Sequence, residues 1–452
     1  MRGFITVDRQ TDYLLPPSVE DWLPDNHLAR FIVEVIEKLD LSELTRAYGG
    51  RGSAAHHPAV LLGLLLYGYA SGVPSSRKIE RATYDSVAFR YIAANTHPDH
   101  DTLATFRRRF GRQLEQLFVQ VLMLAREMGM LKVGKISVDG TKIKANASRH
   151  RALSWGHIQK IEKQLRDEVK QLMALAEADD RKDVPDGLDV PQEIARREDR
   201  LAALDKAKRK LEERARERDV AAQADYEDKV ARRQAKRDMG KKPGGKDPEP
   251  PTSNGPQDKD QINLTDEQSR IMKTAGGGFD QCYNAQAGVD ADSMLIVGAF
   301  VTQACNDKQQ ITPMLERLQA QQEVGLAEQF LADTGYFSEA NVKACLDAGI
   351  EPLIAMKRDR HHSPLLDRWM EPEPLPAGAD AVTTMAHRLK TKAGRADYGL
   401  RKQTVEPVFG IIKHVMNFQQ FLLRGIEKVG HEWNLVALAW NLKRMMKLKM
   451  AG

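Results

Sequence analysis

The sequence predicts an α/β protein in which an all-helical region precedes a sheet, and a long helical insertion interrupts that sheet. Residues about 17 to 130 carry apolar runs of helical type. Short apolar, β-branched segments occur near residue 136 and resume after residue 283. Between them, residues 156–238 are rich in Arg, Lys, Glu and Ala, which is typical of long solvated helices. The predicted parts are 1–130, 131–155, 156–262 and 263–452.

Composition excludes several classes of protein. Of 452 residues, 42% are apolar and 29% charged, which is enough apolar content for a packed core and excludes wholesale disorder. The net charge of +5 is mild for a nucleic-acid binder, so any basic surface must be local. Three cysteines, Cys282, Cys305 and Cys345, occur without a C-x-x-C pattern, so neither a disulfide framework nor a zinc finger is supported.

The predicted location is the cytoplasm. The start of the chain lacks a basic segment followed by an apolar one, so we expect no signal peptide. The longest apolar stretch, at about 60–70, is too short to span a membrane.

The N-terminal region predicts several short helices with basic faces. Residues 60–66 are apolar nearly all round, which suits a buried helix. Ser75 and Ser76 are placed to cap an exposed basic helix, and Asp101 or Thr102 to cap another. A DNA-binding bundle and a helical dimerisation or scaffold domain fit this pattern about equally. The candidate DNA contacts are Arg77, Lys78, Arg107 and Arg108.

Three acids are candidates for chemistry. Asp139 and Asp333 each follow a predicted strand, and Glu406 lies beside a predicted helix start. Acids that leave neighbouring strands can converge at one sheet edge, where their mutual repulsion favours a bound Mg²⁺. Two such ions roughly 3.5–4 Å apart would serve phosphodiester chemistry. Taken singly, each acid is more often a turn or cap residue, and this is how we interpret the rival acids Asp290, Asp292 and Asp307.

Longer stretches around these acids resemble a known family. They are SVDGTKIKANAS (137–148), YNAQAGVD (283–290), LADTGYFS (331–338) and VEPVFGIIK (405–413), followed by FLLRG (421–425) and HEWNL (431–435). Together they resemble bacterial insertion-sequence transposases of the DDE class. The resemblance falls within the insertion-sequence four and five superfamily, and most closely in its group numbered eleven eighty-two.

The resemblance implies a ribonuclease-H-like catalytic core, split by the helical insertion and preceded by the all-helical N-terminal domain. It implies that Asp139, Asp333 and Glu406 hold two Mg²⁺ or Mn²⁺ ions. In such enzymes water first cuts the transposon end, and the freed 3′-hydroxyl then attacks target DNA. The expected partners are double-stranded DNA and a second copy of the chain, in a homodimer or higher synaptic assembly. No nucleotide is expected, because transesterification conserves bond energy.

A Tyr, Arg, Glu, Lys signature accompanies the last acid in the superfamily. Tyr398, Glu406 and Lys413 match it, with Lys413 expected to neutralise a DNA phosphate. Three residues separate Arg from Glu in the signature, which places Lys402 there, whereas Arg401 lies one residue earlier. Which cation serves stays open. Because Pro407 disfavours helical angles at the residue before it, we expect the helix to begin at about Glu406.

The C-terminal segment is basic. Residues 401–452 contain nine Lys or Arg and three Glu, a difference of +6. Such a segment suits contact with backbone phosphates, although an ordinary exposed helix end is the alternative. Trp433 and Trp440, set among apolar residues, are predicted to lie in the core rather than to stack on bases.

Three other functions remain open from the sequence. A hydrolytic nuclease on the same core would cut DNA without joining it. A non-catalytic, transposase-derived DNA-binding protein would bind terminal repeats without needing a metal. A coiled-coil interaction protein would leave the three acids far apart. The insertion at 156–262 fits dimerisation and DNA binding equally.

Overall fold

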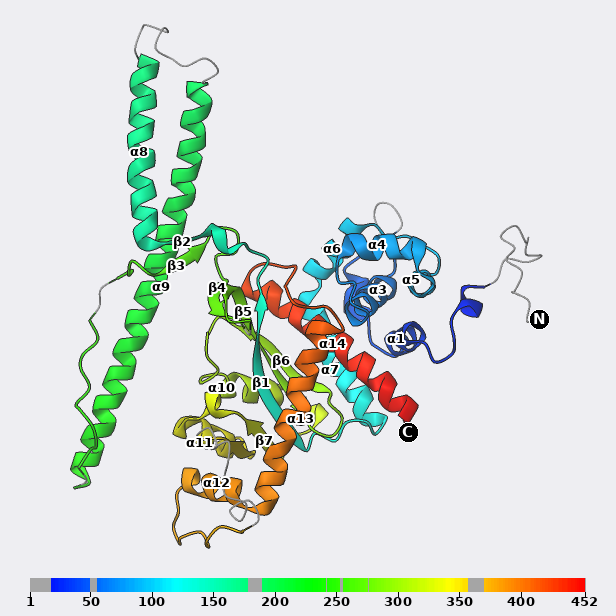
Figure 1. The fold of residues 1–452 in the computed structure, drawn as a ribbon. Helices are drawn as coiled ribbons and strands as arrows, with labels where there is room; N and C mark the ends of the chain where they lie inside the picture. Colours follow the sequence, from blue (N-terminus) through cyan, green and yellow to red (C-terminus); the bar gives the residue numbers. More distant parts are fainter. Residues whose placement is uncertain are drawn as a thin grey trace, which may run out of the picture. The chain divides into compact units, whose positions relative to one another are not determined.

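The structure is a computed structural model that describes residues 18–48, 55–177, 189–240, 242–252, 255–274, 276–356 and 370–451. The chain divides into two compact units (Figure 1). Unit 1 comprises residues 1–145 and 283–452, and unit 2 comprises residues 146–282. The predicted mixed α/β architecture with a helical N-terminal region is confirmed. The N-terminal helices belong to the same compact unit as the sheet.

The N-terminal part of unit 1 is a set of short helices. They are η1 (Val19–Trp22), α1 (Leu28–Glu37), α2 (Ser42–Arg46), α3 (Pro58–Ala70), α4 (Ser76–Asp85), α5 (Val87–Ile92), α6 (His100–Arg109) and α7 (Gly111–Glu127). Helix α3 is buried on nearly all sides, as its apolar sequence predicts. Helix α4 has Ser75 at its N-cap position, as predicted, but the Ser75 side chain makes no capping hydrogen bond, and Ser76 is the first residue of the helix. The predicted cap of α6 was wrong, because Asp99 has extended backbone angles and its carboxylate accepts from the Thr102 N–H.

Five strands of a six-stranded sheet form the centre of unit 1. Its strands are β1 (Lys135–Lys144), β5 (Phe279–Asp290), β6 (Ile296–Thr302), β7 (Gln329–Ala332) and β8 (Glu351–Ile354). Their order is β6-β5-β1-β7-β8, and β7 runs parallel to both β1 and β8, whereas β6 is antiparallel to β5. The short parallel strands are apolar and almost wholly buried, as expected where helices cover both faces of a sheet.

Helices from the C-terminal half of the chain pack on this sheet. They are α10 (Ile311–Ala320), α11 (Glu339–Asp347), α12 (Ala381–Lys390), α13 (Lys392–His414) and α14 (Ile426–Ala451). Helix α14 packs against β6 and also against α3 and α7, so it joins the sheet to the N-terminal helices. Trp433 and Trp440 are buried on α14, as predicted. Their indole N–H groups donate to the carbonyls of Gln286 and Met294 at 2.9 Å.

Helix α13 corrects one prediction about the region of the third acid. It begins at Lys392, where Thr391 caps it, and Pro407 lies inside it rather than in its first turn. An internal proline lacks one N–H donor and costs roughly 3 kcal/mol. Burial of Val405, Val408 and Ile412 on the same helix offsets that cost.

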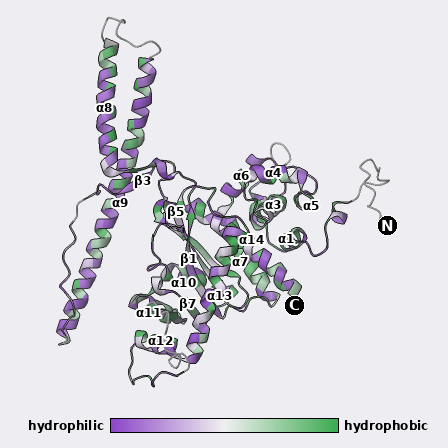
Figure 2. Cartoon of the chain, viewed as in Figure 1, coloured by the Kyte–Doolittle hydropathy of each residue, from purple (hydrophilic) through white to green (hydrophobic). Residues whose placement is uncertain are grey.

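Unit 2 is built on two long helices that pack against each other, α8 (Trp155–Glu177) and α9 (Val190–Asp238). Strands β2 (Ala152–Ser154) and β3 (Gln261–Asn263) form an antiparallel pair, and β4 (Arg270–Lys273) pairs with the first residues of β5. The long charged helices predicted for residues 156–238 are present as α8 and α9. They pack against each other through an apolar cluster that includes Ile158, Leu204 and Leu211. Within the described part of α9, burial ends at Ala215, and Figure 2 shows mainly hydrophilic residues along the rest.

Candidate active site

The register between β1 and β7 brings the first two predicted acids to one edge of the sheet. Parallel pairing runs from Lys135 opposite Gln329 to Val138 opposite Ala332. The next residues on the two strands are Asp139 and Asp333. Because parallel strands end at the same edge, both acids leave the paired region together. Asp139 lies within β1, which continues to Lys144, rather than at its end as the sequence suggested.

Each of these acids accepts a backbone hydrogen bond close by. Asp139 Oδ1 accepts from the Gly140 N–H at 2.8 Å. Asp333 caps the short 3-10 helix η5 (Thr334–Tyr336), and its Oδ1 accepts from the Gly335 N–H at 2.8 Å. These local bonds fix the direction in which each carboxylate leaves its strand.

The Asp139 carboxyl group is costly to ionise, chiefly because it is buried. Burial raises the pKa of Asp139 to about 6, and the negative charges of Asp333 and Asp307 act in the same direction. The Gly140 hydrogen bond and the Arg401 cation act in the opposite direction without cancelling the effect. A carboxylate that is costly to ionise beside other carboxylates is the setting in which a bound cation is stabilising.

Helix α13 brings the third acid to the first through an arginine. Arg401 Nη1 lies 3.3 Å from Asp139 Oδ2, and Arg401 Nη2 lies 3.0 Å from Glu406 Oε1. The arginine is only 7% exposed, whereas half of the Glu406 side chain is exposed. Among the described residues, the buried Nε of Arg401 has no hydrogen-bond partner. One guanidinium therefore joins two of the three acids, and Asp333 acts on it electrostatically.

The other signature residues also lie on α13. Lys402 is exposed, whereas Arg401 is buried and contacts two of the acids, so geometry favours Arg401 as the cation of the acidic centre. Tyr398 is half-buried on the preceding turn. Lys413 is half-buried near the end of the helix, and its carbonyl accepts from Gln419 Nε2 at 3.3 Å.

Asp307 was interpreted from the sequence as a cap or turn residue, and the cap was wrong. Helix α10 begins at Ile311 with Gln310 as its N-cap. The carboxylate of Asp307 instead accepts from two side-chain amides and lies 3.8 Å from Lys142 Nζ. Nothing in the local sequence distinguishes this acid from a helix cap, because the partners come from a strand about twenty residues earlier.

The other two rival acids fit their turn assignment. Asp290 is buried at the end of β5 and accepts from the backbone and hydroxyl of Ser293 at 2.9 and 2.6 Å. Asp292 is exposed in the same turn.

The predicted basic DNA contacts of the N-terminal helices separate into two groups. Arg77 and Lys78 are exposed on α4, and Arg108 is exposed on α6. Arg107 is only 6% exposed and donates to the Tyr69 hydroxyl at 2.9 Å and to the Pro74 carbonyl at 3.2 Å. The Arg107 guanidinium is therefore bound inside unit 1 and is not a candidate phosphate ligand.

The basic C-terminal segment is partly internal as well. Lys443 donates to the Ala70 carbonyl at 2.8 Å, and Arg444 donates to the Ser293 carbonyl at 2.7 Å. Lys449 lies 3.4 Å from Glu34. Fewer cations of residues 401–452 are therefore available to bind a ligand than the net charge of the segment suggests.

Asp139, Asp333 and Glu406 are the kinds of residue that bind divalent metals, but their side chains are not grouped into a complete metal site. In the parts of the chain that the structure describes, no three acidic, histidine or cysteine side chains are grouped to hold a metal ion. Glu406 is engaged by Arg401. Asp139 and Asp333 supply the oxygen ligands that Mg²⁺ and Mn²⁺ prefer, and burial together with the charges of Asp333 and Asp307 raises the pKa of Asp139, so a cation would stabilise its ionised form. The residues present therefore fit such an ion.

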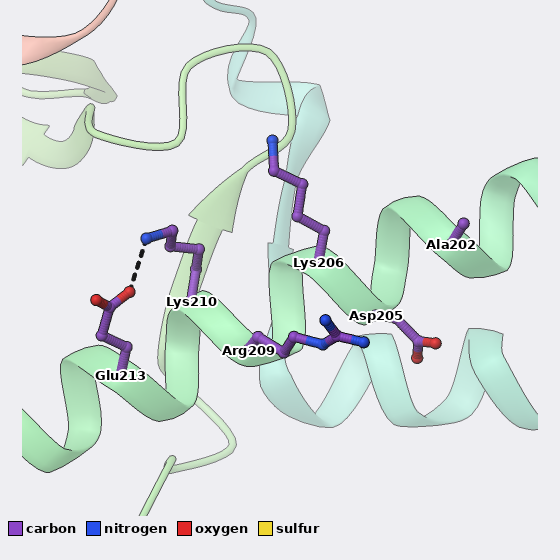
Figure 3. Close-up of a pocket in the computed structure, with 6 residues that line it drawn as sticks. All are labelled: Ala202, Asp205, Lys206, Arg209, Lys210 and Glu213. Atoms are coloured by element: carbon purple, nitrogen blue, oxygen red, sulfur yellow. Dashed lines mark hydrogen bonds and ion pairs between the residues drawn. The ribbon is translucent and has the colours of Figure 1, made fainter.

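A hollow on α9 in unit 2 has a different character. Figure 3 shows it lined by Ala202, Asp205, Lys206, Arg209, Lys210 and Glu213. Lys210 pairs with Glu213 at 2.7 Å, and Lys206 pairs with Glu267 at 2.8 Å. Cations and acids neutralise one another here, so we interpret the hollow as a solvated helix face.

None of the helices in the described parts of the chain combines the length and the hydropathy that a membrane span requires.

Two sequence families match the chain. Residues 17–109 match a family described as Transposase domain (DUF772), and residues 375–446 match one described as Transposase DDE domain. The second match includes Tyr398, Arg401, Glu406 and Lys413, whereas Asp139 and Asp333 lie outside both. No curated protein and no solved structure matches the chain.

Proposed function

Two transposase domains, one of them of the DDE class, mark this chain as an insertion-sequence DDE transposase, and from that premise we propose the reaction that it performs. The chain binds the terminal inverted repeats of a mobile element and cuts its ends by metal-dependent hydrolysis. It then joins those ends to target DNA by transesterification. Membership of the group numbered eleven eighty-two stays a prediction.

The observation that carries this proposal is the grouping of Asp139, Asp333 and Glu406 around Arg401. Two of the acids follow paired residues of parallel strands, and the third is joined to the first by one guanidinium. The strand order β6-β5-β1-β7-β8, with β1 central and parallel to β7, supports a ribonuclease-H-like core. A coiled-coil interaction protein would have no reason to bring these acids together.

We propose that Asp139 and Asp333 hold divalent Mg²⁺ or Mn²⁺, with Glu406 as the third ligand. When bound, two such ions supply activation of the attacking oxygen and stabilisation of the leaving one. The chain contributes the fixed carboxylates and a buried cation that offsets their repulsion. Arg401 thereby keeps Asp139 and Glu406 near each other despite their like charges.

The proposed DNA contacts are the exposed cations Arg77, Lys78 and Arg108, together with Tyr398, Lys402 and Lys413 on α13. Phosphate contacts of this kind make binding strongly dependent on salt. Because two element ends must be brought together, we propose a homodimer or a higher assembly that acts in the cytoplasm. The helical insertion of unit 2 is proposed to take part in this assembly or to bind DNA.

The experiment uses purified full-length chain, a labelled duplex that carries the element's terminal repeat, Mg²⁺ or Mn²⁺, and a target plasmid. Wild type is compared with Asp333→Asn and with the matched control Asp292→Asn, which changes an exposed acid in a turn. We expect metal-dependent cutting and joining by wild type and the control, and neither by Asp333→Asn.

Two results would redirect the proposal. Cutting without joining by wild type indicates a hydrolytic nuclease. Specific binding of the repeat without cutting, in both metals, indicates a non-catalytic DNA-binding protein.

A further inference from the structure

A cluster of polar side chains lies beside the first catalytic acid and is not explained by the acidic triad. Asp307 Oδ1 accepts from Asn284 Nδ2 and from Gln286 Nε2, each at 2.6 Å. Both amide residues belong to β5 and are fully buried. Polar groups with no access to water must be paired internally, so this arrangement is costly to disturb.

The cluster contacts the backbone next to Asp139. A Cβ atom added to Gly140 would lie 2.5 Å from Asp307 Oδ1 and 2.8 Å from Asn284 Oδ1, and would also overlap Gln286 Nε2. Such distances are well inside van der Waals contact, so only glycine allows this approach. The side chains of Asp307, Asn284 and Gln286 therefore pack directly against Gly140, the residue that follows Asp139.

The same cluster reaches the turn that Asp333 caps. The Tyr336 hydroxyl donates to Gln286 Oε1 at 2.5 Å, and Tyr336 is the last residue of η5. Burial raises the pKa of Tyr336 well above its usual value, so the hydroxyl stays protonated and remains a donor. One glutamine thus links the neighbour of Asp139 to the turn of Asp333.

A second amide closes this chain of hydrogen bonds into a ring. Asn341 Nδ2 donates to the carbonyl of Tyr336 at 2.6 Å and to the carbonyl of Lys308 at 2.7 Å. Lys308 directly follows Asp307. The ring therefore runs from Asp307 through Gln286, Tyr336 and Asn341 and back to Lys308, and we call it the Asp307 ring.

We propose that Asp307 is a positioning residue that, through the Asp307 ring, sets the relative placement of Asp139 and Asp333. This inference rests on the proposed function of the triad. Asp307 Oδ1 is already occupied by two amides, which argues for a structural hold on the acids rather than for direct contact with substrate. Residues that orient metal-binding side chains typically affect metal affinity or activity by about 10- to 100-fold when changed.

The test compares Asp307→Ala and Asp307→Asn with wild type and with the matched control Asp292→Asn. Asparagine keeps an oxygen that can accept the two amide hydrogen bonds, whereas alanine does not. The measurements are the cutting rate at saturating terminal-repeat DNA, the Kd for that DNA, and the Kd for Mn²⁺ alone by calorimetry. Thermal unfolding shows whether each variant is folded.

We expect Asp307→Ala to cut about 10- to 100-fold more slowly and to bind Mn²⁺ more weakly by a similar factor. Its Kd for DNA should stay within about twofold, and Asp307→Asn should recover most of both losses. A purely structural role would instead lower the melting temperature and leave the rate and Mn²⁺ affinity of the folded fraction unchanged, which would overturn the proposal.

A second variant covers the case in which Asp307→Ala does not fold. Tyr336→Phe removes one hydrogen bond of the Asp307 ring but keeps the packing of the aromatic side chain. It should reduce both the cutting rate and the Mn²⁺ affinity, each by less than Asp307→Ala does. A wild-type cutting rate and wild-type Mn²⁺ affinity in Tyr336→Phe would contradict the inference. If wild type binds Mn²⁺ but cuts no DNA, the proposed function fails, and the Mn²⁺ affinities alone still decide the role of Asp307.

Discussion

Arg401 Nη1 lies 3.3 Å from Asp139 Oδ2, although 262 residues separate the two in the chain. The same guanidinium contacts Glu406 at 3.0 Å through its other terminal nitrogen. A planar fork of this kind can bind two carboxylates at once, which a lysine cannot do with the same geometry. The acidic centre is therefore organised by a cation as well as by the register of the strands.

Replacing Arg401 should impair catalysis far more than replacing its neighbour. Arg401→Ala removes the charge that offsets repulsion between Asp139 and Glu406, and we expect cutting of terminal-repeat DNA to slow by about 10²-fold. Arg401→Lys should lose less, because charge is kept and the fork is lost. Lys402→Ala, which changes only a proposed DNA contact, is the comparison variant and should stay within a few-fold of the wild-type cutting rate when DNA is saturating. Equal losses for Arg401→Ala and Lys402→Ala would show that the buried contact has no catalytic role.

Asp139→Asn should stabilise the metal-free chain in a pH-dependent manner. Because folding raises the pKa of Asp139 from 3.8 to about 6, the stability from this group is present below pH 3.8 and is lost as pH rises through 6. The asparagine variant avoids that loss. At pH 8 it should unfold with a free energy higher by about 3 kcal/mol, and the gain should vanish near pH 4.

Urea unfolding in the presence of a chelator measures this difference, with Asp292→Asn as a control that should show no such trend. Added Mn²⁺ should reverse the order, because only the carboxylate binds the ion well. A difference between Asp139→Asn and wild type that does not change with pH would contradict the prediction.

Two glycine substitutions should have opposite effects on stability. Gly140→Ala places a methyl group against Asp307, Asn284 and Gln286, and we expect a loss of about 1–3 kcal/mol together with slower cutting. Gly399 is exposed on α13 with open space around it, so Gly399→Ala should stabilise the chain by about 0.5–1 kcal/mol. Denaturant midpoints compare the two variants, and a neutral Gly140→Ala would mean that the close approach does not constrain the site.

Adjacent arginines on α6 should separate folding from DNA binding. Arg107→Ala breaks hydrogen bonds to Tyr69 and Pro74 in the interior and should cost about 2–3 kcal/mol. Arg108→Ala should change stability by less than about 0.5 kcal/mol but weaken DNA binding and lower the slope of log K against log salt by about 1. Unfolding and binding titrations at several salt concentrations test both. A loss of stability in Arg108→Ala, with only weaker DNA binding in Arg107→Ala, would contradict the prediction.

Much of the fold could be predicted from the sequence because its patterns are local. The apolar helix α3, the strands that precede Asp139 and Asp333, and the charged helices α8 and α9 each follow from runs of one residue type. The start of α13 could not be predicted in the same way. Its burial against the sheet outweighs the local cost of Pro407, and such tertiary packing is not visible in a short window of sequence.

The residues of the candidate site also differ in whether the sequence could predict them. The three acids were predicted from strand ends and from motifs that resemble those of transposases, and Asp139 and Asp333 follow neighbouring paired residues. The choice of Arg401 over Lys402 depends on which side of α13 is buried, and the spacing of residues alone suggested the opposite. The contacts of Asp307 could not be predicted, because its partners Asn284 and Gln286 lie on β5, about twenty residues earlier in the chain.

The most direct test of the central claim, that Asp139, Asp333 and Glu406 form one metal centre, is cleavage of the protein itself by bound iron. Fe²⁺ replaces Mg²⁺ in the full-length chain, and ascorbate with peroxide then generates radicals that cut the backbone near the ion. The account predicts fragments that end close to all three acids, suppressed by excess Mg²⁺ and absent in Asp139→Asn. Cuts confined to other parts of the chain, or unchanged in Asp139→Asn, would contradict it.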